Sequence, residues 1–128
     1  MDSRCPQSAK DRFLFLLSKE EGRLPVNFVV TLPKITSSQQ VSTLVEVFEI
    51  FEDRFDLDEG TLKLEFMVET PQSLFSISGE SALNGFLAAS KGRCRGAHFG
   101  TYDYTASLNI TAGHQEMDHL VCDFAKNF

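Results

Sequence analysis

Apolar residues along the chain follow two spacings, and segments with one spacing alternate with segments with the other. The strand-like segments are rich in β-branched and aromatic residues and lie at 26–35, 61–71 and 94–105. The helix-like segments place apolar residues three and four positions apart, most regularly at Val41, Leu44, Val45, Phe48 and Phe51. The predicted helices are 11–21, 39–55, a stretch that starts near Pro71 and resumes at 83–89, and 115–126.

This alternation predicts how the strands pair. Strand–helix–strand order implies parallel strands joined by right-handed crossovers, so the fold class is α/β. Ligands of parallel α/β sheets bind at the carboxyl ends of the strands. Three charged residues stand near those ends: Lys34 on the first strand, Glu69 on the second and Asp103 on the third.

Glu69 and Asp103 are the most informative residues of the sequence. Neighbouring strands lie about 4.8 Å apart, so carboxylates at the ends of two such strands could reach one ion. Mg²⁺ is usually held by one or two carboxylates together with water and substrate oxygens, so this pair suits a hard divalent cation. Lys34 would neutralise a carboxylate or phosphate beside the ion, or would be an ordinary lysine at a strand end.

The second strand carries polar residues on one face. Its apolar face consists of Leu62, Leu64, Phe66 and Val68, and its other face of Lys63, Glu65, Met67 and Glu69. In one interpretation the apolar face packs on helices and the other looks into a closed barrel, with Lys63 and Glu65 paired inside and Glu69 at the rim. In the other, this is an edge strand with one face in water.

Composition narrows the function classes. A length of 128 residues suits one domain, and a net charge of −6 argues against a nucleic-acid-binding surface. The three cysteines are far apart and form no C-x-x-C pair, which disfavours zinc. No apolar run approaches the ~20 residues of a membrane span. We therefore expect a cytoplasmic protein that binds neither nucleic acid nor a membrane.

Several other residues have plainer interpretations. His98, between Ala97 and Phe99, is expected to be a hydrogen-bonded core histidine, and Tyr102 and Tyr104 are expected to serve mainly in packing. Three familiar motifs are absent: a glycine-rich phosphate loop, a G-x-S-x-G elbow and H-E-x-x-H. The sequence alone therefore names no catalytic residue.

Three stretches together carry a resemblance to a known superfamily: LPKI, LEFMVETPQSLF and GAHFGTYDYTASLNI. With these motifs the chain resembles the pyruvate/phosphoenolpyruvate-type barrel proteins, which include the HpcH/HpaI aldolases, the citrate lyase β-subunit-like proteins and the malate synthases. The FGTYDYTAS and MDHLVCDFAK runs are similar to those of a group of bacterial aldolase/citrate-lyase-like proteins. The likeness covers about residues 12–128.

The resemblance implies a fold and a chemistry. The fold would be a parallel (β/α) repeat, a partial TIM barrel of about three βα units out of eight. Glu69 and Asp103 would bind Mg²⁺ or Mn²⁺, and the backbone amides of Gly100 and Thr101 would face the substrate carboxylate. Lys34, from its position at the end of the first strand, is a further candidate for binding the substrate. The implied activity is a metal-dependent carbon–carbon lyase or aldolase reaction through an enolate. Its substrate would be a pyruvate-, oxaloacetate- or glyoxylate-type 2-oxo acid or its acyl-CoA adduct.

The chain is short for that fold, since a full barrel takes about 250 residues. The substrate-binding arginine of the superfamily stands on an early strand, and Arg93 and Arg95 are expected at the amino end of the third strand, too far away to replace it. We therefore expect residues 1–128 to be one partial-barrel segment, either a fragment of a longer protein or a chain that forms homo-oligomers. The alternative function is a catalytically incomplete family member that acts as an interaction module.

Overall fold

The computed structural model describes residues 24–128, so the helix predicted at 11–21 lies outside the described part of the chain. Three strands form one parallel sheet in the order β1-β2-β3, which confirms the predicted α/β class. The strands are β1 (Val29–Leu32), β2 (Lys63–Val68) and β3 (Cys94–Phe99). Their helices are α2 (Ser38–Arg54), α3 (Pro71–Leu74), α4 (Ala82–Ala89), α5 (Thr101–Ser107) and α6 (Leu120–Asn127), with a short 3₁₀ helix at Ala112–His114.

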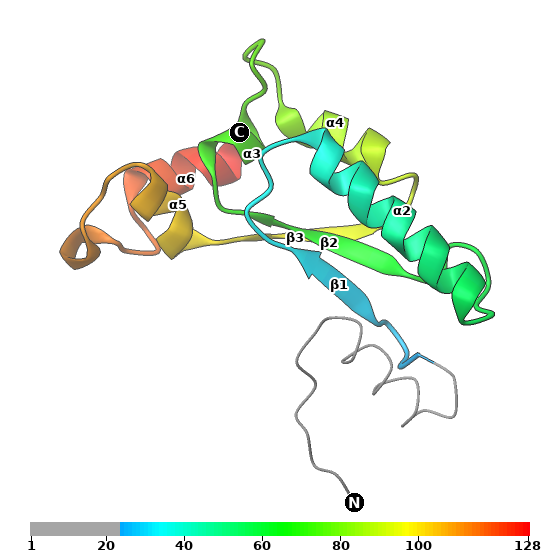
Figure 1. The fold of residues 1–128 in the computed structure, drawn as a ribbon. Helices are drawn as coiled ribbons and strands as arrows, with labels where there is room; N and C mark the ends of the chain where they lie inside the picture. Colours follow the sequence, from blue (N-terminus) through cyan, green and yellow to red (C-terminus); the bar gives the residue numbers. More distant parts are fainter. Residues whose placement is uncertain (1–23) are drawn as a thin grey trace, which may run out of the picture.

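Helices α2 and α4 lie side by side over the same face of the sheet (Figure 1). The apolar face of β2 packs against them, as one of the two interpretations predicted, and Leu62, Leu64 and Phe66 are almost completely buried. Phe66 meets Phe86 of α4 edge-on, with 5.9 Å between ring centroids. The strand pairs with β1 on one side and with β3 on the other, so the alternative interpretation of β2 as an edge strand is wrong.

The second face of β2 is only partly buried, and its polar residues pair differently from the prediction. Glu65 was expected to pair with Lys63, but it accepts a hydrogen bond from Thr31 of β1 and lies 2.8 Å from His98 Nε2 of β3. Thr31 stands directly opposite Glu65 in the pairing of β1 and β2, and such cross-strand neighbours are closer than residues two apart along one strand. His98 is hydrogen-bonded, but its side chain is 57% exposed, so its predicted core position is wrong.

The chain after β3 differs most from the prediction. The third strand ends at Phe99 instead of continuing through Asp103, and the helix α5 follows at once. Tyr104 of α5 packs with Val68, Leu74 and Cys122 in a second apolar cluster. This packing favours a helical turn for a segment whose aromatic and β-branched residues predicted a strand.

The last predicted helix is also shorter than expected. It begins at Leu120 instead of residue 115, and His119 caps it by accepting a hydrogen bond from the Val121 amide at 3.2 Å. The helix predicted near Pro71 is present as α3, with its interruption and the following α4. Among the helices within residues 24–128, none is both long and apolar enough to cross a membrane.

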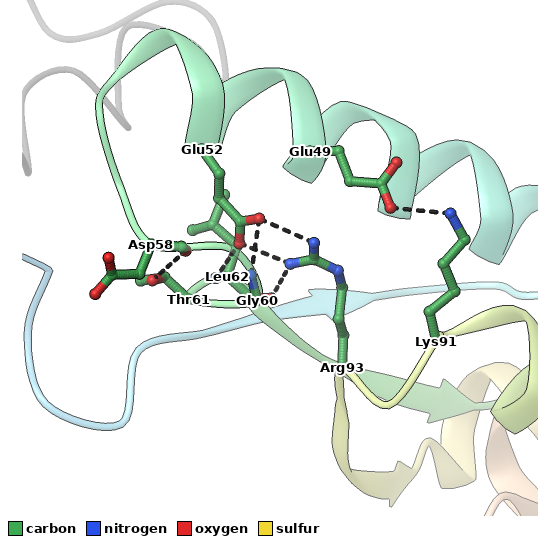
Figure 2. A network of polar contacts seen from close by, with 8 residues as sticks. All are labelled: Glu49, Glu52, Asp58, Gly60, Thr61, Leu62, Lys91 and Arg93. Carbon is green, nitrogen blue, oxygen red and sulfur yellow. Dashed lines mark hydrogen bonds and ion pairs between the residues drawn. The ribbon is translucent and has the colours of Figure 1, made fainter.

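A buried ion pair fastens the amino end of the sheet (Figure 2). Arg93, just before β3, donates from Nη1 to Glu52 Oε1 at 2.6 Å and from Nη2 to Glu52 Oε2 at 2.9 Å. The same carboxylate of α2 accepts hydrogen bonds from the backbone amides of Leu62 at 2.7 Å and Gly60 at 3.0 Å. One carboxylate thus joins α2, the loop before β2 and the start of β3.

Candidate functional site

The candidate site lies at the carboxyl ends of the strands, opposite the Glu52–Arg93 pair. Glu69 directly follows the last residue of β2. Asp103 is the third residue of α5, so its predicted position on a strand is wrong. It nevertheless stays at the same end of the sheet, because Gly100 alone separates β3 from α5.

Lys34 connects the two carboxylates. It lies in the loop after β1 with φ = 50°, a left-handed conformation that is uncommon for a residue with a side chain. Its backbone amide donates to Glu69 Oε1 at 2.8 Å, and its ammonium lies 2.7 Å from Asp103 Oδ1. The segments that follow β1, β2 and β3 therefore meet at one place, and the structure brings Glu69 and Asp103 together as the topology predicted.

Glu69 is buried against the backbone of Gly100, although it is a carboxylate. Only 5% of the residue is exposed. A Cβ at position 100 would lie 2.7 Å from both Cβ and Oε2 of Glu69, so this position requires glycine. Close packing here fixes the carboxylate at the end of β2.

The amides predicted to bind a substrate carboxylate differ in their partners. The Gly100 amide donates to the Val68 carbonyl at 2.9 Å, which continues the pairing of β2 and β3 by one residue. Gly100 therefore contributes space for Glu69 and a sheet hydrogen bond. Thr101 is buried at the first position of α5, where backbone amides have no hydrogen-bond partner within the helix. Binding of a substrate carboxylate by the Thr101 amide therefore stays a prediction consistent with this position.

Lys34 and Asp103 form the charged pair of the site. The hydrogen bond from the Lys34 ammonium holds the pKa of the Asp103 carboxyl below its ordinary value, against the opposing effect of desolvation. The hydrogen bond to Asp103 likewise raises the pKa of Lys34. At neutral pH the site therefore holds a charged ammonium beside a charged aspartate.

The two carboxylates suit a site in which Mg²⁺ or Mn²⁺ is also bound by water and by substrate oxygens. Glu69 and Asp103 offer hard carboxylate oxygens. Within residues 24–128 no group of three or more histidine, cysteine, aspartate or glutamate side chains could hold a metal ion by itself. A cation at this site would therefore complete its shell with water or substrate oxygens, and the metal role of the two carboxylates stays a prediction.

The two tyrosines and two arginines considered in the sequence lie where they were expected, except for Tyr102. Tyr104 is buried in the second apolar cluster, as expected, whereas Tyr102 is 61% exposed. Arg93 and Arg95 lie at the amino end of β3, away from the carboxylates. The described residues thus place no arginine of the β3 region at the candidate site.

Comparison with known proteins gives one family and one relative of known name. The model of a family described as a domain of unknown function, DUF6986, matches residues 7–128. Malate synthase A from Escherichia coli (strain K12) is 34% identical over 76 residues, which cover 59% of this chain. The match spans only 13% of the length of that enzyme. The similarity supports a distant relationship with the predicted superfamily.

Proposed function

The chain belongs to the DUF6986 family, and we propose that it forms the metal-binding part of a Mg²⁺-dependent carbon–carbon lyase or condensing enzyme. The observation that carries the proposal is the meeting of Glu69 and Asp103 on Lys34 at the carboxyl ends of parallel strands. The partial similarity to malate synthase A supports the same class of chemistry. The proposed substrate is a small 2-oxo acid of the pyruvate, oxaloacetate or glyoxylate type, or its acyl-CoA adduct.

Each residue of the site has a distinct part in this proposal. Glu69, held rigidly by Gly100 and by the Lys34 amide, and Asp103, at the surface of α5, would bind Mg²⁺ or Mn²⁺. Bound Mg²⁺ acts as a Lewis acid that stabilises negative charge developing on an oxo-acid oxygen. The amide of Thr101 and the ammonium of Lys34 would orient the substrate carboxylate.

A second candidate function is a family member without complete catalytic machinery. It is favoured by the position of Arg93, which is committed to Glu52 at the opposite end of the sheet and cannot reach a substrate at Glu69. A module of this kind would keep the fold and act by interaction. Metal binding separates the two functions, because an interaction module has no need of it.

Isothermal titration calorimetry with Mg²⁺, and with Mn²⁺ as a second probe, tests the proposal. We expect the 128-residue chain to bind either ion, and Glu69→Gln and Asp103→Asn each to lose binding. The amide oxygen introduced by Glu69→Gln can still accept the hydrogen bond from the Lys34 backbone amide, so we expect the variant to fold. Far-UV circular dichroism checks this. Glu49→Gln, which removes a carboxylate of α2 that pairs with Lys91, is the matched control and should bind like the wild type.

Wild-type protein that takes up no Mg²⁺ or Mn²⁺ would contradict the proposed chemistry and favour the interaction module. Equal binding by wild type and by both site variants would place the ion elsewhere and remove Glu69 and Asp103 from the site.

A further inference from the structure

One contact of the site goes beyond what metal binding alone requires. The Lys34 ammonium lies 2.7 Å from Asp103 Oδ1, which is one of the oxygens a cation at this site would need. An ammonium and a divalent cation repel each other, so binding both to one carboxylate at the same time is less favourable than binding either alone. Lys34 therefore stands in direct competition with a metal ion for Asp103.

We propose that the Lys34 ammonium is an exchangeable counter-ion of the candidate metal centre, neutralising Asp103 and leaving it when a divalent cation binds. The inference rests on the proposed function, because it takes Glu69 and Asp103 as the ligands. It assigns Lys34 a role in the charge balance of the site before a cation binds, in addition to any contact with substrate.

The exposure of the pair makes such an exchange easy. The side chains of Lys34 and Asp103 are 63% and 55% exposed. Exposed ion pairs are weak because water and salt screen them, so a divalent cation can displace the ammonium at little cost. The Glu52–Arg93 pair is the contrast in the same chain, since both of its side chains are almost completely buried.

The backbone of Lys34 has a separate task that the exchange would leave intact. Its amide holds Glu69 through a bond that does not involve the side chain. Loss of the ammonium therefore frees Asp103 without releasing Glu69. A Lys34→Met variant keeps the backbone amide and most of the aliphatic length, so it removes the charge selectively.

Mg²⁺ calorimetry on wild type and Lys34→Met tests the inference. We expect Lys34→Met to bind about two- to fivefold more tightly, since this is the range expected for loss of one exposed ion pair. Lys91→Met is the matched control: Lys91 forms an exposed pair with Glu49 at 2.9 Å, and its loss should leave Mg²⁺ affinity unchanged. The side-chain ¹⁵N resonance of Lys34 should shift during the titration, and that of Lys91 should not.

The outcomes separate the inference from the function on which it rests. Mg²⁺ binding by wild type with equal or weaker binding by Lys34→Met would overturn the counter-ion role and leave the metal centre standing. Absence of binding in both proteins would overturn both. Binding by Lys34→Met alone would also overturn the exchange, because the ammonium would then exclude the cation from the wild type instead of leaving Asp103 to it.

Discussion

At the residue scale, the candidate site depends on a glycine. Gly100 lets the backbone after β3 approach Glu69 so closely that a Cβ would lie 2.7 Å from two of its atoms. Real side chains do not tolerate such a contact, so either the carboxylate or the backbone must move. The geometry of Glu69 and the approach of α5 are thus set by one position.

We expect Gly100→Ala to lower the free energy of unfolding by about 1–3 kcal/mol, the usual cost of overpacking, and to weaken Mg²⁺ binding by displacing Glu69. Urea unfolding and calorimetry measure the two effects. Gly96→Ala on β3 is the control, because nothing lies within 4 Å of a Cβ there. Equal unfolding midpoints for the two variants would contradict the close packing of Gly100 on Glu69.

The Glu52–Arg93 pair allows a second prediction at this scale. Burial raises the pKa of Glu52, but hydrogen bonds from Arg93, Leu62 and Gly60 together lower it more, so it lies below its ordinary value of 4.5. Glu52→Gln leaves the buried guanidinium without its counter-charge and turns an amide group toward it. We expect a loss of about 3–5 kcal/mol at neutral pH, as is typical when one partner of a buried pair is removed.

The sign of the pH dependence follows from the lowered pKa. The stabilisation by Glu52 is fully present above its unfolded pKa and is lost as the pH falls through its folded pKa. The difference in unfolding free energy between wild type and Glu52→Gln should therefore shrink as the pH drops below about 4.5. Urea midpoints across the acid range measure it, and Glu49→Gln should show little difference at any pH. A gap that stays constant with falling pH would contradict the ion pair.

At the element scale, the strands and the long helices could be predicted because their patterns are produced by burial. The alternation in β2 and the three- and four-residue spacing in α2 reflect the single apolar layer between them. Helix α5 could not be predicted in this way. It is short, and it is stabilised by the packing of Tyr104 on residues distant in the sequence, whereas its own composition favours a strand.

The candidate site shows the same division. The approach of Glu69 and Asp103 could be predicted because carboxyl ends of parallel strands meet at one edge, and this held even though Asp103 belongs to a helix. The contacts of Lys34 with both carboxylates could not be predicted, because they depend on a left-handed backbone conformation at Lys34, in a loop that contains no glycine. The role of Glu52 was also missed, since its position on α2 gives no sign of the distant Arg93.

At the scale of the whole molecule, the described sheet has helices over one face, and β1 and β3 are its edges (Figure 1). Four consecutive residues of β3, Arg95 to His98, are exposed. An edge strand with free pairing groups is a template for another strand, and lysine on such an edge blocks this pairing. Self-association through β3 would pair the backbone groups of this edge with a strand of a second copy.

We therefore expect the 128-residue chain to form homo-oligomers, and sedimentation velocity at several concentrations to show an increase in mass with concentration. Ala97→Lys, at an exposed position of β3, should shift the chain toward monomer without loss of helical signal. Leu120→Lys is the comparison: it replaces an 82% exposed apolar residue on α6, outside the sheet, and should leave the association unchanged. A monomer at all concentrations would contradict the prediction. If Leu120→Lys suppressed association and Ala97→Lys did not, the contact between copies would lie on α6 and not at the sheet edge, because the apolar surface of that helix would then be what association buries.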